Sequence, residues 1–460
     1  MGQTRIERDP LGEMPVPVEA LWGIQTERAR QNFPISHLRP LPAFVDAVIQ
    51  IKKAAALSNK ATGRLDAKLA DAIVRAADEV LAGGHRDQFV VDPYQAGAGT
   101  SHNMNCNEVL ANRANELLGA KRGEYKPVHP NDHVNMAQST NDVIPTAVRI
   151  GALNLLAPLA EALTRLARAF LEKGEAFDDI VKSGRTHLQD ATPVRLGQEF
   201  AAFGHSVERN RDRIARAADD LRELGIGGTA TGTGINTPPG YRFAVVKHLG
   251  AQFRTAPDLR EAMQSQLPVV AVSAALRNLA LELTRITNDL RLLSSGPMTG
   301  LAEIFLPSVQ PGSSIMPGKV NPSLLECMNQ VLFHIIGSAT AIDYASQAGQ
   351  LELNVMMPLV AFEISFSIEI LKNFLPVLID KCIDGIEANR ERCEQYYISS
   401  PSLATALNPI IGYAAAAEVA KEAMKTGKTI PDLLREKKML SEERIREIFT
   451  PEFLAGQADR

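Results

Sequence analysis

Apolar residues recur at steps of three and four through the middle of the chain. One such run marks a single face of a long helix that begins near Pro145: Leu156, Leu159, Leu163, Leu166 and Phe170. Four further stretches share this spacing, near residues 193–224, 257–294, 322–347 and 353–381. Long helices with wide apolar faces bury those faces against one another, so the pattern predicts a bundle of five helices and an oligomer.

Shorter patterns flank this central part. Residues 1–140 mix proline and glycine with short helical runs, such as the one from Leu65 to Gly84, which closes on a glycine C-cap signal. The final residues carry short helical patterns around TGKTIPDLL and LSEERIREIF. We therefore expect an all-α chain in three regions: an N-terminal helical domain at 1–140, a central helical bundle at 141–395 and a small C-terminal helical domain at 396–460.

Composition and charge narrow the class of protein. Hydrophobic residues make up 45% of the 460 residues and aromatics only 5%, which is typical of packed helices rather than a β-sandwich. The net charge is −4 and the basic residues are spread along the chain, so no nucleic-acid partner is expected. The N-terminus lacks an apolar signal region, and no uninterrupted apolar run approaches membrane length, which predicts a cytoplasmic protein without a membrane partner.

Three polar segments that we expect to be loops interrupt the helical pattern. They are AGAGTSHNMNCNEV (Ala96 to Val109), HPNDHVNMAQSTND (His129 to Asp142) and GSSIMPGKVNP (Gly312 to Pro322), and a fourth, GRTHLQDATP (Gly184 to Pro193), separates two bundle helices. Glycine lets a backbone approach a ligand, Ser, Thr and Asn offer uncharged hydrogen bonds, and Lys319 adds a positive charge. This inventory suits a small dianion, although turns and helix caps use the same residue types.

The sequence offers little support for a metal or a cofactor. His129 and His133 lie four residues apart, but their segment contains Pro and Asn and has no Glu in H-E-x-x-H register. The glycines follow neither a dinucleotide-binding nor a P-loop spacing. The four cysteines lack CxxC spacing and are expected to be reduced thiols: Cys106, Cys327, Cys382 and Cys393.

The third polar segment is the most specific feature of the chain. GSSIMPGKVNP resembles the signature of the fumarase and aspartase superfamily, and the resemblance extends from RIERDPLGEMPVP to the C-terminal ALNPIIGY. It implies an elongated all-α protomer in three regions with a central five-helix bundle. It also implies a homotetramer with a twenty-helix core, active sites shared by three subunits, a small dicarboxylate substrate, and no cofactor or metal.

The resemblance further implies three catalytic residues. Ser313, the first serine of the signature, is the base that removes a proton next to a carboxylate, on a mobile loop that closes over the substrate. Ser314 and the loop amides receive the developing negative charge. His187 belongs to the site, and Glu326 matches the carboxylate that pairs with this histidine and fixes its tautomer.

The substrate-binding residues implied by the resemblance form two groups. Lys319 and Asn321, helped by Thr186 and His187, hold one carboxylate. The other group completes the pocket from neighbouring subunits and comprises Thr100, Ser101, Ser139, Thr140 and Asn141. Of these, Thr100, Ser139 and Thr140 meet the reacting carboxylate. Asn141, together with His187, meets the leaving amino group.

Local motifs resemble the aspartase branch more than the fumarase branch. GAGTS and QSTND stand where fumarases typically show GSGTQ and QSSND, and DQFVVDPYQ, GEYK and QAGQLELNVM point the same way. The resemblance therefore implies reversible elimination of ammonia from L-aspartate to give fumarate through an aci-carboxylate intermediate. Met298 replaces a usual arginine and Met357 a usual glutamate, which leaves open a class II fumarate hydratase acting on malate and fumarate, or a lyase for a substituted amine. A non-catalytic helical scaffold is the remaining alternative.

Overall fold

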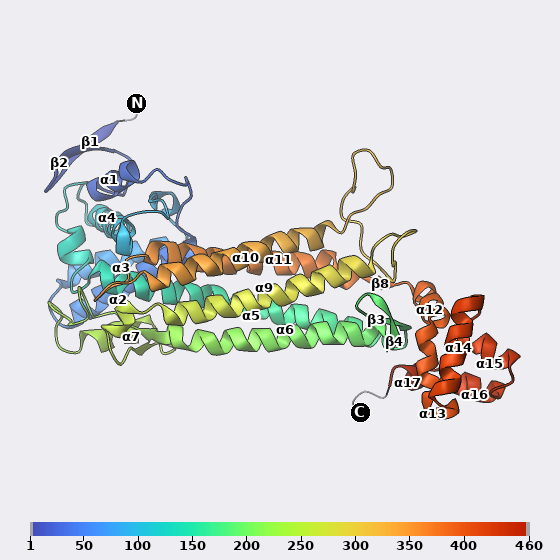
Figure 1. Ribbon diagram of the computed structural model, residues 1–460. Coiled ribbons are helices and arrows are strands. Elements are labelled where there is room, and N and C mark those ends of the chain that lie inside the picture. The colour runs from blue at the N-terminus through green and yellow to red at the C-terminus, as the bar shows by residue number, and fades with distance from the viewer. Residues whose placement is uncertain (1–2, 457–460) are drawn as a thin grey trace. The chain divides into compact units, whose positions relative to one another are not determined.

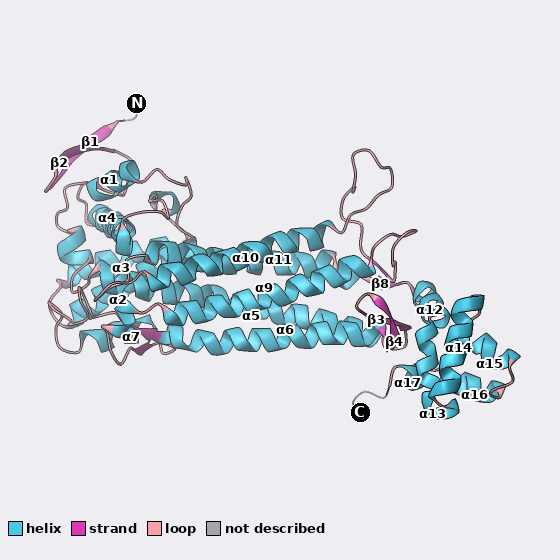
Figure 2. Ribbon diagram, in the orientation of Figure 1, coloured by secondary structure: helices cyan, strands magenta, loops and turns pink. Residues whose placement is uncertain are grey.

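Helices dominate the computed structural model, which describes residues 3–456 (Figures 1 and 2). This confirms the predicted all-α class. The described strands form four two-stranded sheets, in which β1 pairs with β2, β3 with β4, β5 with β6 and β7 with β8. Their bounds are β1 Thr4–Asp9, β2 Gly12–Pro17, β3 Val181–Thr186, β4 Gln189–Arg195, β5 Glu223–Leu224, β6 Arg254–Thr255, β7 Ile304–Phe305 and β8 Glu387–Ala388.

The chain divides into two compact units. Unit 1 comprises 1–160, 212–280 and 333–372, and unit 2 comprises 161–211, 281–332 and 373–460. The boundaries between them fall inside the five long helices: α5 Thr140–Ala176, α6 Leu196–Ala218, α9 Leu267–Leu293, α10 Ser323–Gln347 and α11 Met357–Lys381. The predicted division into three regions at residues 140 and 395 remains a prediction.

Unit 1 also holds the shorter N-terminal helices. They are α1 Ile24–Asn32, α2 Pro42–Ala61, α3 Ala67–Leu81, α4 Thr100–Leu117, α7 Tyr241–Leu249 and α8 Glu261–Gln264, with short turns η1 Arg86–Gln88, η2 Gly97–Gly99 and η3 Pro130–Val134. The helix predicted between Leu65 and Gly84 is α3, and Asp66 caps it by accepting the backbone N–H groups of Lys68 and Leu69. Within the same unit, α10 packs on α11 through His334 and Phe366, whose ring centroids lie 5.1 Å apart.

Aromatic and polar contacts join the long helices inside unit 2. Phe170 of α5 lies against Phe200 and Phe203 of α6, with ring centroids 6.3 and 5.8 Å away. The Thr287 hydroxyl of α9 donates to the Asn329 side chain of α10 at 2.5 Å. Packing of these helix faces follows the predicted periodicity, since Leu163, Leu166 and Phe170 are all buried.

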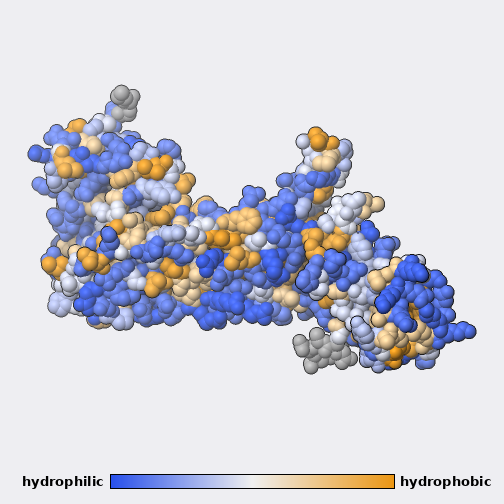
Figure 3. Space-filling model, viewed as in Figure 1, coloured by the Kyte–Doolittle hydropathy of each residue, from blue (hydrophilic) through white to orange (hydrophobic). Residues whose placement is uncertain are grey.

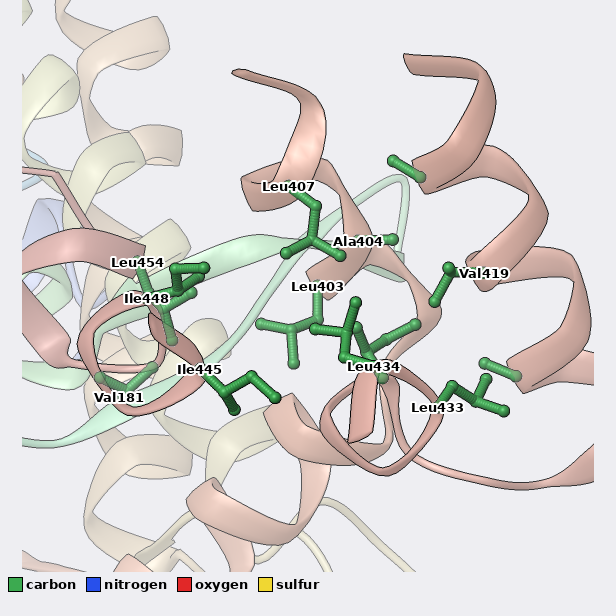
Figure 4. Close-up of a cluster of buried hydrophobic side chains, with 13 residues drawn as sticks. Val181, Leu403, Ala404, Leu407, Val419, Leu433, Leu434, Ile445, Ile448 and Leu454 are labelled. Atoms are coloured by element: carbon green, nitrogen blue, oxygen red, sulfur yellow. The ribbon is translucent and has the colours of Figure 1, made fainter. Parts of the chain in front are cut away.

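The C-terminal part of unit 2 has its own apolar core. Leu403, Leu433, Ile445 and Ile448 belong to one buried cluster, which also includes Val181 of β3 (Figure 4). The cluster confirms the short helices predicted around TGKTIPDLL and LSEERIREIF, which are α15 and α16. The elements of this part are η5 Ile383–Gly385, α12 Arg390–Ser399, η6 Pro401–Leu407, α13 Asn408–Ile411, α14 Tyr413–Thr426, α15 Ile430–Glu436, α16 Glu442–Ile448 and α17 Pro451–Leu454; η4 Asp219–Arg222 belongs to unit 1.

Two sequence predictions about local structure are wrong. The continuous helix expected at 257–294 is broken, because Pro268 has no backbone N–H to donate and therefore sits in the first turn of a new helix, α9. The segment from Ala96 to Val109 is helical from Thr100 onward rather than a loop. Its Asn, Ser and His side chains have low helix propensity, but most of them are buried in tertiary contacts that override it.

Two described helices are long and apolar enough to cross a membrane, as judged by length and composition alone. They are α5 and α9, and 72% of the apolar window of α5 is buried inside the chain, against 39% for α9. These helices carry charged residues such as Arg149 and Arg277, which interrupt their apolar runs. Core helices of soluble proteins pass the same test, so two such helices are weak evidence for a membrane protein.

Candidate functional site

The signature segment of unit 2 is a loop between β7 and α10, as predicted. The Ser313 hydroxyl oxygen accepts the backbone N–H groups of Ile315 at 3.2 Å and of Met316 at 3.0 Å. Hydrogen bonds of this kind favour negative charge on the oxygen, so they make the serine easier to ionise to the alkoxide that accepts a proton in the reaction. The geometry is thus compatible with the predicted role of Ser313 as a base.

The base of this loop is closed by contacts around Gly312. Its N–H donates to the Lys319 carbonyl at 2.9 Å, and the Asn321 side-chain amide donates to the Gly312 carbonyl at 2.5 Å. A Cβ at position 312 would lie 2.4 Å from the Lys319 carbonyl oxygen, so only glycine permits this approach. Ser313, Ser314, Lys319 and Asn321 are thereby held in one small loop.

A cavity of about 350 Å³ opens beside the signature loop in unit 2. Lys319 and Asn321 line it, together with Phe305, Gly296 and Pro297. One fixed positive charge and one amide in a partly apolar wall suit a small carboxylate. Met298, which replaces an expected arginine, directly follows Pro297 and is 84% exposed.

Thr186 and His187 stand at the tip of a β-hairpin, which sequence analysis did not predict. β3 pairs with β4, and His187 and Leu188 form the two-residue turn with φ of 56° and 58°. Two left-handed residues are typical of the turns that match strand twist, but these positions favour Asn and Gly. The hairpin therefore presents the exposed His187 ring at the cost of backbone strain.

A buried ion cluster supports this hairpin from below. The Glu303 carboxylate is fully buried and lies 2.9 Å from Arg185 and 3.3 Å from Lys182, both on β3. Lys182 also contacts Glu199 of α6 at 2.9 Å. Burial outweighs these cations for Glu199 and raises the pKa of its carboxyl group.

The predicted pairing of Glu326 with His187 is not seen within one chain. Glu326 instead lies 3.9 Å from Arg291 Nη2 of α9. The pairing of Glu326 with His187 therefore stays a prediction.

The remaining predicted site residues lie in unit 1, at the beginnings of α4 and α5. Thr100 is the first residue of α4 and follows two left-handed residues, Ala98 (φ 62°) and Gly99 (φ 85°). Thr140 is the first residue of α5 and follows Ser139. The beginning of a helix carries a partial positive charge from the helix dipole, so both sites favour a carboxylate.

A side-chain contact brings these two helix beginnings together. The Asn103 amide, one turn into α4, donates to the Thr140 hydroxyl at 3.2 Å and to the side-chain oxygen Oδ1 of Asn135 at 3.3 Å. Ser101 is buried beside the start of the same helix. Five predicted residues are therefore grouped in unit 1: Thr100, Ser101, Ser139, Thr140 and Asn141.

Buried titratable groups lie beneath this part of unit 1. The Lys52 ammonium is fully buried and donates to Asn135 Oδ1 at 2.8 Å; burial lowers the Lys52 pKa to about 7. Burial raises the pKa of Asp142 to about 6, although backbone N–H donors and Lys52 oppose the shift. His102 stacks on Phe44 at 4.8 Å, and burial lowers its pKa to about 3, so its ring is neutral at pH 7.

Sequence analysis missed the glycine-rich segment from Gly225 to Gly234. The Asn141 side chain donates to the Ala230 carbonyl at 2.9 Å, which places this segment directly against a predicted site residue. The signal was present, because GIGGTATGTG is as rich in Gly and Thr as the segments that were singled out.

The two histidines that were considered as metal ligands form hydrogen bonds with the backbone of their own segment. The His129 backbone N–H donates to His133 Nδ1 at 2.8 Å, and the Asn131 N–H donates to His129 Nδ1 at 3.2 Å. Both Nδ1 atoms therefore act as acceptors for backbone groups. All four cysteines are free, as predicted.

Comparisons with known proteins give a consistent result. The lyase family profile matches residues 12–337, and the profile of the fumarase C C-terminus matches residues 403–456. Aspartate ammonia-lyase from Bacillus subtilis is 48% identical over 97% of this chain and 95% of its own length, and that from Helicobacter pylori is 47% identical over 97% of both. Among solved structures, fumarate lyase:delta crystallin from Brucella melitensis in native form matches with a TM-score of 0.91 at 46% identity, covering 97% of this chain and 100% of its own.

A second solved structure is more distant in sequence. The class II fumarase from Schistosoma mansoni matches with a TM-score of 0.94 at 35% identity, covering 99% of this chain and 100% of its own. Fold, signature loop and relatives agree over almost the whole sequence. The chain belongs to the lyase family that includes fumarases and aspartases.

Proposed function

We propose that the protein catalyses the reversible elimination of ammonia from L-aspartate to give fumarate. The observation that carries this proposal is the identity of 47–48% to proteins named aspartate ammonia-lyase, over nearly the full length of both chains. The class II fumarase shares the fold but only 35% of its sequence. Identity alone does not choose a leaving group, so the site chemistry must also fit.

Ser313 is the proposed base. Its oxygen takes a proton from the carbon next to one carboxylate, the C–N bond then breaks, and its electron pair leaves with nitrogen as ammonia. The intermediate between these steps is an aci-carboxylate dianion, which needs donors already in place. Ser314 and the loop amides serve this purpose, and the two N–H groups that the Ser313 oxygen accepts favour its anionic form.

The two substrate carboxylates have two different binding sets in this proposal. Lys319 and Asn321, with Thr186, bind one of them beside the cavity in unit 2. The beginnings of α4 and α5 bind the other through Thr100, Ser101, Ser139 and Thr140. Asn141 and His187 meet the amino group, and Glu326 orients His187.

A homotetramer with a twenty-helix core completes the site in this proposal, with three subunits contributing to each active site. Exposed apolar side chains support it: Leu281 of α9 is 54% exposed and Phe333 and Tyr344 of α10 are 56% and 67% exposed. The tip of the signature loop also exposes Ile315 and Met316, and Figure 3 shows apolar surface there. Apolar faces of this extent on long helices usually meet another copy of the chain.

The leaving group can be tested directly. Purified protein is mixed with fumarate, with ammonium in one sample and only buffer in the other, and loss of fumarate absorbance is followed with identification of the product. Aspartate formed only with ammonium supports the proposal. Malate formed without ammonium identifies a fumarate hydratase instead.

A lyase for a substituted amine is the second candidate. Met298 stands where the family usually carries arginine, and its neighbours Gly296 and Pro297 line the cavity beside Lys319. Replacing a cation with an apolar side chain at such a place suits a larger, less polar leaving group. Absence of both aspartate and malate in the first experiment, with product formed from fumarate and a simple alkylamine, would favour this candidate.

A further inference from the structure

The carboxylate of Asp142 links two distant segments of unit 1. One oxygen accepts the backbone N–H of Ser139 at 2.9 Å. The other accepts the N–H groups of Gly227 at 3.0 Å and Thr229 at 2.9 Å. Asp142 is fully buried, so these bonds are formed away from water. Ser139 caps α5, because the N–H of Asn141 donates to its hydroxyl at 3.3 Å, and Asp142 completes a capping box.

The second segment is held in an unfavourable conformation at this contact. Thr229 has φ of 54°, which a β-branched residue adopts only when its surroundings hold it there. Its hydroxyl oxygen is buried and has no hydrogen-bond partner among residues 3–456. The Asn141 side chain donates a hydrogen bond to the carbonyl of Ala230, the residue after Thr229, at 2.9 Å. Adjacent side chains of α5 therefore hold Gly227, Thr229 and Ala230.

We propose that Asp142 is a positioning residue, which sets the orientation of Ser139, Thr140 and Asn141 by tying them to the segment from Gly227 to Ala230. This inference rests on the proposed function, in which those three residues meet the substrate. Asp142 itself touches no substrate, because it is buried behind the start of α5.

A carboxylate is required at this position for a simple reason. All three partners of Asp142 are N–H donors, and an ionised carboxylate only accepts. An amide of the same shape would turn its own N–H₂ group toward one or two of these donors. Asp142→Asn therefore breaks one side of the contact with little change in volume, and the loosened start of α5 should bind substrate less well.

Glu108 provides a matched control. It is also fully buried in unit 1, and it accepts the backbone N–H groups of Gly23, Gln25 and Thr26 at 2.9, 2.9 and 3.1 Å. The Thr26 hydroxyl also donates to it at 2.6 Å, so Glu108 ties another remote segment as a hydrogen-bond acceptor. None of its side-chain hydrogen bonds within residues 3–456 reaches a candidate site residue. Glu108→Gln should destabilise the protein in a similar way without changing the site.

The first measurement is hydrogen exchange of the full-length protein, which does not depend on any substrate. Asp142→Asn should accelerate exchange in peptides covering 137–143 and 225–234, and Glu108→Gln should accelerate it only around 23–26. Exchange that is unchanged at 137–143 and at 225–234 in Asp142→Asn overturns the proposal. If Asp142→Asn does not fold, Gly227→Ala is measured in its place. Gly227 has φ of 95°, and a Cβ added there would lie only 2.7 Å from the Arg242 Cβ, so alanine should displace the Gly227 N–H from Asp142.

The second measurement is steady-state kinetics with L-aspartate. KM of Asp142→Asn should rise about tenfold, whereas KM of Glu108→Gln should stay within about twofold of wild type. An unchanged KM in Asp142→Asn, or an equal rise in Glu108→Gln, overturns the positioning role. If the wild type itself releases no ammonia from aspartate, the proposed function fails, and the exchange measurement still decides the structural link.

Discussion

The ammonium group of the fully buried Lys52 donates a hydrogen bond to the side-chain oxygen of Asn135 at 2.8 Å within unit 1. Asn135 Oδ1 also accepts from Asn103 and Asn107 at 3.3 and 3.2 Å, and Asn103 in turn donates to Thr140. A buried cation thus connects to a predicted site residue through two amides. Desolvation is the main cost of this arrangement, and it acts on the charged form of the lysine.

Lys52→Met should change how stability depends on pH. Burial lowers the Lys52 pKa to about 7 from 10.5, so folding favours the neutral amine. Its contribution to stability is fully present above about pH 10.5 and is lost as pH falls through 7. Between pH 7 and 10.5 the unfolding free energy of the wild type should therefore gain a few kcal/mol relative to the variant.

Urea unfolding at several pH values checks this prediction. The control is Lys53→Met, because Lys53 is the next residue of α2, is partly exposed and pairs with Asp78 at 2.5 Å. That variant should change stability by less than about 1 kcal/mol at every pH. Parallel curves for wild type and Lys52→Met would contradict the prediction.

Ser313→Ala should lower kcat for aspartate by several orders of magnitude, because it removes the proposed proton acceptor and nothing else in the loop replaces it. The fold should persist, since the two N–H groups that Ser313 accepts lie in an exposed loop. Ser399→Ala, at the exposed end of α12, is the control and should keep normal activity. Near-normal turnover of Ser313→Ala would remove it as the base.

Periodicity and capping predicted the helices well where local and tertiary preferences agree. The helical pattern from Leu65 to Gly84 and its closing glycines gave the position of α3, and Pro268 could have shown where α9 starts. The segment that contains His102 and Asn103 was wrongly predicted to be a loop. These polar side chains are buried, and the helix they belong to depends on tertiary contacts that a local sequence pattern does not contain. The Asp142 contact spans about 85 residues of sequence, so no local signal could predict it.

The signature loop is the opposite case. The resemblance of GSSIMPGKVNP to a family signature singled out Ser313, Lys319 and Asn321 before any geometry was known, and their roles stay predictions. The His187 hairpin could not be foreseen in the same way. Two-residue turns are predicted from Asn-Gly or Asp-Gly pairs, and His-Leu is neither.

Lys319→Ala should mainly weaken substrate binding. Lys319 supplies the positive charge at the cavity beside the signature loop, and a hydrogen bond to a charged group is worth about 1.5–3 kcal/mol. KM for aspartate should therefore rise at least tenfold. Titration calorimetry with fumarate gives an independent readout, and Lys421→Ala on the exposed face of α14 is the control. Unchanged fumarate affinity in Lys319→Ala contradicts its proposed role.

Leu188→Gly should stabilise the β3–β4 hairpin. Leu188 is 71% exposed and has φ of 58°, so its side chain gains little from packing and strains the turn. Glycine adopts this conformation freely, which should raise the unfolding free energy by about 1 kcal/mol. Gln189→Gly, in the extended first position of β4, should lower it instead. Chemical denaturation distinguishes the two, and equal destabilisation by both would show that the turn is not strained.

The association state follows from where the long helices leave apolar side chains uncovered. Only 39% of the apolar window of α9 is buried within the chain, and Phe333 and Tyr344 on α10 are more than half exposed. A tetramer of 49.9 kDa chains should give a mass of about 200 kDa by light scattering. Phe333→Glu should lower that mass and abolish activity together, because the proposed site needs several subunits. Met424→Glu on α14, which is 66% exposed outside the long helices, should leave both unchanged. A monomer mass for the active wild type would contradict the shared site, because one chain would then have to supply both Glu326 and His187, whereas Glu326 lies against Arg291 within the chain.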